Sequence, residues 1–418
     1  MRKIMFEIFQ KVKKGKVLEN LGYLETHYGL VGEEEQNNKL KNLLDHAINT
    51  TEYYKGYSIY KTLEEYPVIE KKVIKENYNH FISSAYNKDK LIPMTTSGSY
   101  GTPFTFLLTK QKKEMQHAEV LFFSKWANFD IGVKHGYVVS KIKSKKDQFI
   151  QNQFSIAPFK ISEEWLSNEK ERIISNKLKV LIGYPSAIGA IAKYFNSKKE
   201  FFKLDGVITI SEVLTDDVRI SIKKAFGVNA ISRYSTEELG VLAIECEKNQ
   251  KHHINNINYI VEILDINENK PVKPGEMGRV VVTDLYSHAM PLIRYDTGDL
   301  AILGQGDCEC GIKTPYLETL SGRKLEEIYS PEGTVIASMG LNGRMRDIEN
   351  VLQFQLIQIG EKDYQINLVV MEEFSSEDEI IKRYKELIGK DANIIIKYMQ
   401  DIPPLSSGKR PYILQRYY

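Results

Sequence analysis

The feature that most constrains how this chain can fold is an alternation of apolar strands and helices between residues 179 and 234. Residues 179–184 (KVLIGY) read as a strand, and Pro185 then opens a run of apolar residues at helical spacing. A second strand (DGVITIS), a helix with Thr215 as a plausible N-cap and Gly227 at its end, and a third strand (VNAISRY) follow. Strands joined by helices in this order predict a parallel sheet with helices covering it.

The segments on either side of this alternation carry other patterns. The first ninety residues read as mainly helical, whereas residues 258–303 are rich in strand candidates. The end of the chain predicts a small unit of two strands around a turn, a helix begun by a Ser376–Glu379 capping box, and a further strand. We therefore expect an α/β fold with a large N-terminal domain (1–322), whose mixed and parallel sheets are covered by helices, and a small C-terminal α+β domain (323–418).

Composition excludes several classes of protein. A net charge of +2 leaves no dominant field for nucleic acid, and no stretch reaches the roughly 18 apolar residues that a membrane-spanning helix needs. Three cysteines are too few for a secreted disulfide scaffold, and the N-terminus is a poor signal peptide. These observations predict a cytoplasmic protein with no transmembrane segment and no nucleic-acid partner.

The first segment that could carry chemistry is the Gly- and hydroxyl-rich stretch Thr95–Pro103. Two glycines let the backbone approach an anion closely, while N–H groups and hydroxyls can donate hydrogen bonds to phosphate. The stretch is not a P-loop, because no lysine follows its second glycine. An ordinary Ser/Thr/Gly surface turn is the alternative interpretation.

The second segment, Tyr234–Gly240, follows directly after the third predicted strand. Open α/β sheets bind ligands at the carboxyl ends of their strands, so Tyr234 could stack on a base and a glutamate could hold phosphate-bound Mg²⁺. A helix N-terminus enriched in acids explains the same residues without a ligand.

Two further segments each contain one candidate residue. In Ala289–Asp299, the carboxylate of Asp299 follows a Thr-Gly turn and could accept hydrogen bonds from both hydroxyls of a ribose. An aspartate in a hairpin turn is the common alternative. Near the end of the chain, Ser406–Lys409 holds a lysine on a Gly/Ser loop, although most tail lysines are simply solvated.

The order of these segments is more specific than any one of them. The series TSGSYGTP, YSTEELG, AMPLIRYDTGD, SGRKLEEI and PPLSSGK resembles the adenylate-forming (ANL) superfamily across most of the chain. Within it the sequence looks most like the phenylacetate–CoA ligase branch, and especially its CapK-type members associated with capsular polysaccharide biosynthesis. The segments LLDHAINTTEYYKGY, IGYPSAI and CECG before TPYLETLSGR add to this likeness.

The resemblance implies a set of nucleotide-binding and catalytic residues. Those implied to bind ATP are Thr96, Ser97, Gly98, Ser99, Tyr100, Gly101, Thr102, Tyr234, Ser235, Thr236, Asp299 and Arg323. Glu238 would hold Mg²⁺, and Lys409 would neutralise the charge that develops as a carboxylate attacks the α-phosphorus of ATP. The small domain would be a mobile lid that rotates about the Gly322–Arg323 junction after this step.

Several residues depart from the pattern of the superfamily. Tyr100 and Thr102 stand where many relatives have Thr and Lys, and Ser235 stands where a glycine is usual. Glu237 precedes Glu238, and spacing from Tyr234 and Gly240 favours Glu238 as the metal ligand. After Gly322-Arg323, two glutamates replace the usual aspartate.

The implied function is ATP-dependent activation of a small-molecule carboxylic acid through an acyl-adenylate, followed by transfer of the acyl group to a thiol such as coenzyme A. An alternative keeps the adenylation and transfers the acyl group to an amine or hydroxyl in cell-envelope polysaccharide assembly. A separate carrier protein would be needed if the acceptor is a carrier. A third alternative is a nucleotide-binding scaffold without catalysis, which the presence of Lys409 disfavours.

A possible structural zinc site is the last feature of the sequence. Cys308-x-Cys310, with Cys246 and either His252 or His253 upstream, offers three thiolates and an imidazole. We assign His252 as the fourth ligand. Three unrelated reduced thiols are the alternative.

Overall fold

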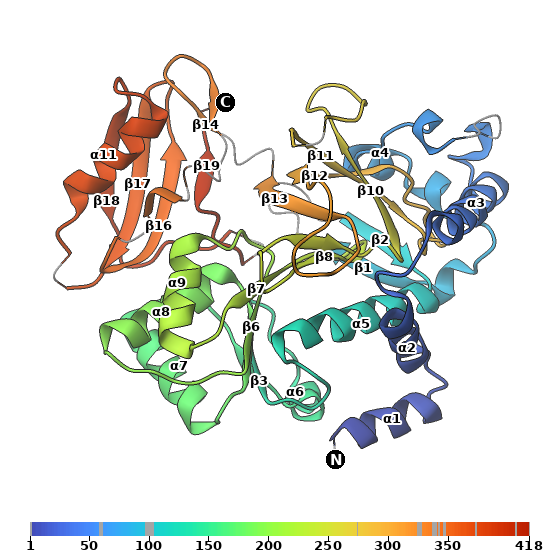
Figure 1. Ribbon diagram of the computed structural model, residues 1–418, viewed down its shortest axis with the longest axis horizontal. Helices are drawn as coiled ribbons and strands as arrows, with labels where there is room; N and C mark the ends of the chain where they lie inside the picture. The colour runs from blue at the N-terminus through green and yellow to red at the C-terminus, as the bar shows by residue number, and fades with distance from the viewer. Residues whose placement is uncertain are drawn as a thin grey trace. The chain divides into compact units, whose positions relative to one another are not determined.

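The computed structural model describes residues 2–417, apart from 58–61, 97–103, 274, 324–327, 337–340, 342, 346–347, 373 and 406–407 (Figure 1). The chain divides into two compact units, and each is built from two stretches of sequence. The first unit comprises residues 1–126 and 233–320, and the second comprises residues 127–232 and 321–418. The domain division expected from the sequence, 1–322 and 323–418, stays a prediction.

The first unit begins with helices and ends with strands. Its helices are α1 (Arg2–Val12), α2 (Val17–His27), α3 (Glu33–Thr50), α4 (Lys71–Glu76) and α5 (Lys110–Ser124), with short 3₁₀ turns at Lys55–Tyr57, Leu63–Glu65, Tyr78–Phe81, Lys88–Lys90 and Lys125–Ala127. Its strands are β1 (Ile92–Thr96), β2 (Phe104–Leu108), β8 (Gly240–Glu245), β9 (His252–Ile254), β10 (Tyr259–Leu264), β11 (Met277–Asp284) and β12 (Tyr295–Leu303). β7 (Ala230–Thr236) and β13 (Tyr316–Arg323) each run across a sequence boundary between the units.

The strands of the first unit form an antiparallel sheet. They lie in the order β10-β11-β12-β13-β9-β8-β7, and β1 and β2 pair separately as an antiparallel hairpin. Apolar residues of β10–β12 pack with residues of α3, α4 and β2 in one core that includes Leu43, Ile74, Phe106 and Val282. Because this core covers the sheet on which the motif 289–299 lies, it fixes the backbone of that motif.

A buried polar network connects α5 to this sheet. The ammonium of Lys112 lies 2.6 Å from the carboxylate of Asp284, and both side chains are almost fully buried. Glu119, two turns further along the same face of α5, accepts hydrogen bonds from the backbone N–H of Val241 at 3.0 Å and from the hydroxyl of Tyr259. Buried charges persist only when they are paired and hydrogen-bonded, so this network fixes α5 against β8, β10 and β11.

Gly240 lies in the narrowest part of this network and permits a stability test. Its φ is +119°, and a Cβ would sit 2.3 Å from Glu119 Oε2 and 2.7 Å from the hydroxyl of Tyr259. We expect Gly240→Ala to lower the free energy of unfolding by about 3 kcal/mol or more, through backbone strain and overpacking. Chemical denaturation followed by circular dichroism measures this change.

Gly22 provides the matched control. It lies inside α2, and a Cβ there would have no heavy atom within 4 Å. Gly22→Ala is therefore expected to raise the free energy of unfolding by about 0.5–1 kcal/mol, because alanine loses less entropy in a helix. Equal transitions for Gly240→Ala and the wild type would contradict the close packing at Gly240.

The second unit contains the predicted alternation of strands and helices. Its elements from residue 127 are β3 (His135–Val138), α6 (Lys145–Gln151), β4 (Gln153–Ile156), α7 (Glu163–Ser175), β5 (Val180–Gly183), α8 (Pro185–Ser197), β6 (Gly206–Ile210) and α9 (Asp216–Phe226). The strands β6-β5-β3-β4 form a parallel sheet, and α8 packs on α9 and on β5 (Figure 1). The strands predicted at 179–184, 205–211 and 228–234 are thus confirmed.

The C-terminal part of the second unit has a sheet of its own. Its elements are β14 (Ile328–Tyr329), β15 (Val335–Ile336), a 3₁₀ turn (Gly343–Met345), β16 (Val351–Gln358), β17 (Asp363–Val370), α11 (Glu377–Ile388), β18 (Asn393–Tyr398) and β19 (Ile413–Gln415). The four-stranded sheet has the order β18-β17-β16-β19, and Ile380, Tyr384 and Ile388 of α11 are buried in its core. The expected α/β class, with a large mixed sheet and a smaller C-terminal sheet, is confirmed.

One detail of this part differs from the sequence prediction. Ser376 precedes α11, but its side chain makes no capping hydrogen bond, so the predicted capping box does not form. Glu379 pairs instead with Arg383 one turn further along the helix. An i,i+4 ion pair therefore replaces the predicted contact.

None of the helices in the described part of the chain combines the length and apolar character that crossing a bilayer requires.

Candidate active site

A tyrosine–aspartate pair defines one part of the site in the first unit. The hydroxyl of Tyr234, on β7, donates a hydrogen bond to Asp299 Oδ2 on β12 at 2.7 Å and lies 3.2 Å from the hydroxyl of Thr297. Burial, followed by the charge of Asp299, raises the pKa of Tyr234 well above its ordinary value. The phenol therefore stays protonated and holds the carboxylate, which itself is partly exposed.

The turn before Asp299 has the geometry that its sequence predicts. Gly298 is exposed with φ of +77°, in the left-handed region that favours glycine. Its N–H donates to Asp296 Oδ1 at 2.8 Å, and the Thr297 hydroxyl donates to the carbonyl of Val280 at 3.0 Å. These contacts present Asp299 on an ordered turn.

A second tyrosine–carboxylate pair lies close to the first. The hydroxyl of Tyr295 donates to Glu238 Oε1 at 3.0 Å. Burial is the main cause that raises the pKa of Tyr295, and the charges of Glu238 and Asp299 raise it further. Glu238 is buried, whereas Glu237 is exposed. Of the two neighbouring glutamates, Glu238 is therefore the one that faces the interior of the site.

Glu238 and Tyr295 line a small pocket that also reaches the hairpin β1–β2. Phe104, Met290 and Leu292 contribute to its wall. Phe104 pairs with Thr96 across the hairpin, so the two described residues that flank segment 97–103 lie opposite each other, and Phe104 lines this pocket. Six of the residues predicted to bind phosphate, Ser97 to Thr102, lie outside the described residues, as does the side chain of Thr96.

The remaining residues that the sequence predicts to bind the nucleotide are Ser235, Thr236 and Arg323. Ser235 and Thr236 pair with Val241 and Gly240 at the end of the β7–β8 hairpin, and the hydroxyl of Thr236 accepts the N–H of Leu239 at 3.1 Å. This contact shapes the turn that bears Glu238. Arg323 ends β13, and its side chain lies outside the described residues.

Arg294 has a structural role that the sequence alone did not reveal. Its backbone is left-handed, with φ of +50°, and its buried guanidinium donates to both oxygens of Glu262 at 3.1 and 2.9 Å. It also donates to the carbonyls of Glu64 and Tyr66, each at 2.8 Å. The arginine of the motif 289–299 thus ties the N-terminal segment to β10 and β12 and does not itself extend into the pocket lined by Glu238.

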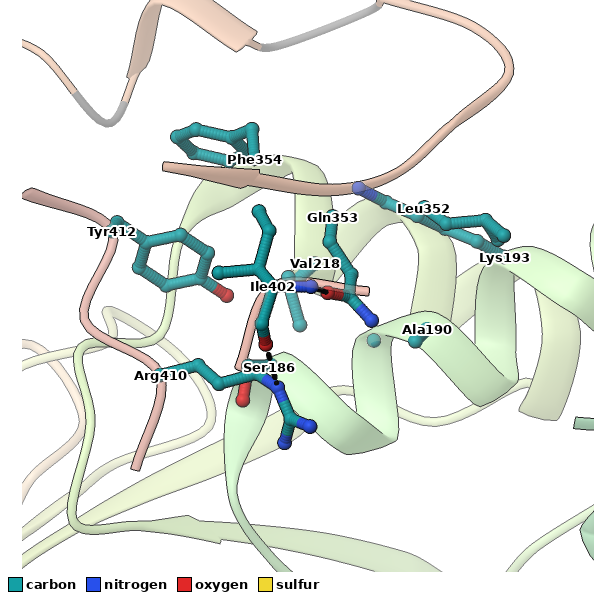
Figure 2. Close-up of a pocket in the computed structure, with 11 residues that line it drawn as sticks. Ser186, Ala190, Lys193, Val218, Leu352, Gln353, Phe354, Ile402, Arg410 and Tyr412 are labelled. Atoms are coloured by element: carbon teal, nitrogen blue, oxygen red, sulfur yellow. Dashed lines mark hydrogen bonds between the residues drawn. The ribbon is translucent and has the colours of Figure 1, made fainter. Parts of the chain in front are cut away.

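In the second unit, the segment that carries Lys409 is held by Arg410. The buried guanidinium of Arg410 donates to the carbonyls of Ile402 at 2.7 Å, Pro158 at 2.7 Å and Phe159 at 3.1 Å. Figure 2 shows Arg410 in a small pocket that is lined by residues of α8 and β16 and by Ile402 and Tyr412. Its hydrogen bond to Ile402 is drawn as a dashed line. Sequence reasoning missed Arg410, because three carbonyl acceptors leave no trace in residue types.

Glu212 also holds the segment that carries Lys409. Its carboxylate accepts the backbone N–H of Arg410 at 2.8 Å and that of Ser186 at 3.1 Å. Burial raises the pKa of Glu212, while these two N–H groups and the charge of Lys409 act in the opposite direction. Gly408 has φ of +80°, and a Cβ there would sit 2.0 Å from the hydroxyl of Ser140, so only glycine fits before Lys409.

The cysteines of the first unit lie together. The side chains of Cys246, His253, Cys308 and Cys310 bring their ligand atoms within 4.8 Å of one another. Adjacent residues of a strand point to opposite faces, so β9 can offer only one of its two histidines to the thiols. That residue is His253, and the assignment of His252 from the sequence is corrected accordingly.

Comparison with solved structures identifies the fold class. 2-Hydroxyisobutyryl-CoA ligase in its post-adenylation state, in complex with R3-HIB-AMP, matches with a TM-score of 0.75 and 15% identity, over 94% of this chain and 92% of that chain. ATP-bound MatB from Rhodopseudomonas palustris matches with a TM-score of 0.54 and 13% identity, over 78% and 67% of the two chains. The fold is that of the adenylate-forming ligases.

Comparison with curated proteins narrows this class. Protein CapK of Staphylococcus aureus is 25% identical over 446 aligned residues, which cover 98% of this chain and 97% of that protein. Residues 328–416 match the family described as the CapK C-terminal domain. Phenylacetate-coenzyme A ligase of Thermus thermophilus is 32% identical over 146 residues, a third of each chain. The resemblance to the phenylacetate–CoA ligase and CapK-type branch is confirmed, as is the enzyme class of adenylate-forming ligase.

Proposed function

We propose that this protein joins a small carboxylic acid to AMP from ATP and then transfers the acyl group to a thiol such as coenzyme A. The observation that carries the proposal is the pair of carboxylates, Asp299 and Glu238, each held by a buried tyrosine. Structural neighbours described as acyl-CoA ligases in complex with acyl-AMP support the same reaction.

The residues present suit a nucleotide and its metal ion. The partly exposed carboxylate of Asp299 can accept hydrogen bonds from ribose hydroxyls, because Tyr234 fixes its orientation. Glu238 offers a hard oxygen ligand for Mg²⁺ in the pocket that Phe104 also lines. Bound there, Mg²⁺ would neutralise phosphate charge. The predicted stacking of Tyr234 on adenine remains a proposal.

The proposed reaction has two steps. A carboxylate oxygen of the acid attacks the α-phosphorus of ATP, the bond to the bridging oxygen breaks, and pyrophosphate leaves. Lys409 stabilises the negative charge that grows during this attack. The acceptor thiol then attacks the acyl carbon, and AMP leaves with the electron pair of the carbon–oxygen bond. We also retain the proposals of a mobile C-terminal domain from residue 323 and of a cytoplasmic location, where ATP and coenzyme A are available.

Carboxylate-dependent exchange of labelled pyrophosphate into ATP tests the first step. We expect exchange with at least one member of a panel of aryl, fatty and sugar acids, and none without an acid. Binding of ATP without exchange for any member of the panel would favour the scaffold alternative and contradict the proposal. Omitting Mg²⁺ should abolish exchange, and Glu238→Gln should raise the Mg²⁺ concentration needed for half-maximal exchange about tenfold or more.

The acceptor is tested with the acid that supports exchange. Coenzyme A should be consumed in proportion to AMP release, as measured by loss of free thiol. If candidate amines or hydroxyl compounds accelerate AMP release while coenzyme A does not, the acceptor is the alternative that likeness to CapK suggests. Either result leaves the adenylation step intact, so the two parts of the proposal are judged separately.

A further inference from the structure

We propose that Cys246, His253, Cys308 and Cys310 form a structural zinc site in the first unit. The site would fasten the β8–β9 hairpin to the segment between β12 and β13. It is independent of the proposed reaction, because none of its four residues belongs to the nucleotide site described above.

The distances between the side chains match a tetrahedral ion. With Zn–S of about 2.3 Å and Zn–N of about 2.0 Å, tetrahedral geometry separates two sulfurs by about 3.8 Å and a sulfur from a nitrogen by about 3.5 Å. Cys246 Sγ lies 3.9 Å from Cys308 Sγ, and Cys310 Sγ lies 3.1 Å from His253 Nε2. All four ligand atoms lie within 4.8 Å of one another, so small side-chain shifts suffice to complete the tetrahedral coordination sphere of one ion.

The local backbone explains how the thiols converge. Cys246 follows β8, and its backbone pairs with Lys251 across a tight turn that brings His253 back on the adjacent strand. Cys308 and Cys310 lie on a turn closed by the N–H of Gly311 on the carbonyl of Cys308, with Gly311 at φ of +88°. A Cys-x-Cys-Gly turn of this kind presents two sulfurs to one side.

Hydrogen-bond partners of His253 and Cys308 favour the protonation states in which these side chains bind a cation. Thr314 lies 3.1 Å from Nδ1 of His253, so its hydroxyl can accept the Nδ1 proton and leave Nε2, which faces Cys310, as the free ligand. The amide of Asn249 points at Cys308 Sγ from 3.6 Å. Such donors stabilise thiolates, as ligand sulfurs require.

The donor set argues for zinc and for a structural role. Three sulfurs and one imidazole suit Zn²⁺, whereas Mg²⁺ and Ca²⁺ prefer oxygen. His253 is fully buried, and Cys246 and Cys308 are 3% and 6% exposed. Four protein ligands leave no position for a reacting water, so the ion would stabilise the fold and take no part in chemistry. A disulfide is the competing use of the thiols, but it needs sulfurs about 2 Å apart.

Metal analysis of the tag-free wild-type protein, purified without chelators, tests the site. We expect about one zinc per chain by mass spectrometry of the metal content. Removal with a thiol-blocking mercurial should release it and lower the midpoint of thermal unfolding by several degrees. Regenerating the free cysteines with excess dithiothreitol, which takes up the mercury, and then refilling with Co²⁺ should give the visible absorption and thiolate charge-transfer bands of a tetrahedral thiolate site.

Two neighbouring histidines provide matched variants. The His253→Asn variant should lose most of the zinc. The His252→Asn variant, which changes the preceding residue of the same buried strand, should keep it. Cys308→Ser should lose zinc as His253→Asn does. If a variant fails to fold, the metal content and cobalt spectrum of the wild type still decide the matter.

Three results would overturn the proposal. One is wild-type protein without zinc that also fails to bind added Zn²⁺ or Co²⁺ under reducing conditions. Another is equal zinc content in wild type and His253→Asn, which would place the metal elsewhere. The third is detection of a Cys246–Cys308 or Cys308–Cys310 disulfide in protein isolated from the cell. None of these results bears on pyrophosphate exchange, so a failed zinc site and a failed adenylation remain distinguishable.

Discussion

Lys409→Ala is expected to slow acyl-adenylate formation on the order of 10²–10³-fold, the usual cost of removing one preorganised group that stabilises transition-state charge. The two residues that flank Lys409 are held in this structure, because Gly408 fits closely against Ser140 and Arg410 donates to three carbonyls. The substitution should therefore remove the charge without moving the backbone. Pyrophosphate exchange measures the effect on the first step.

The second step provides an internal control for this variant. If the lysine acts only while the acyl-adenylate forms, Lys409→Ala should consume a chemically prepared acyl-adenylate and coenzyme A at close to the wild-type rate. Lys397→Ala, which removes an exposed charge from β18, should leave both steps unchanged. Exchange at the wild-type rate in Lys409→Ala would remove the lysine from the proposed chemistry.

Asp299→Ala is expected to reduce kcat/KM for ATP by about 10²-fold, mostly through KM. Each hydrogen bond to a charged group contributes about 1.5–3 kcal/mol, and a ribose offers two hydroxyls to this carboxylate. Tyr234→Phe should have a smaller effect of about 3–10-fold, because it removes only the hydroxyl that orients Asp299. Initial rates at varied ATP concentration give both values.

Comparison of two substitutions at Tyr234 separates its two proposed roles. If the ring also packs against adenine, Tyr234→Ala should weaken ATP binding well beyond Tyr234→Phe, since phenylalanine keeps the ring. Calorimetry with ATP and the folded variants measures this difference. An unchanged KM for ATP in Asp299→Ala would refute the ribose assignment.

Periodic patterns in the sequence predicted the fold well. The strands at 179–184 and 205–211 and the helices after them are confirmed, because apolar spacing and the caps Pro185 and Gly227 act locally. The failed capping box at Ser376 shows the limit of such rules. There Glu379 pairs with Arg383, and only the surrounding structure decides between two contacts of similar energy.

The site was predictable only in part. Motif order identified Asp299, Glu238 and Lys409 as candidates, whereas the contacts that position them come from residues distant in sequence. The choice between His252 and His253 depends on which face of β9 meets the thiols, and a one-residue change of register reverses it. Likewise, Arg294 reads as part of a nucleotide motif, yet its partner Glu262 lies on another strand.

The buried pair of Lys112 and Asp284 has a consequence for protein engineering. Recombining this chain with a relative at any crossover between these two positions would combine the helix of one parent with the strand of the other. A parent that has an apolar residue at either position would then leave one charge in the core without its counterion, at a cost of about 3–5 kcal/mol. Chimeras should therefore inherit residues 112–284 as one block, or exchange both members of the pair together.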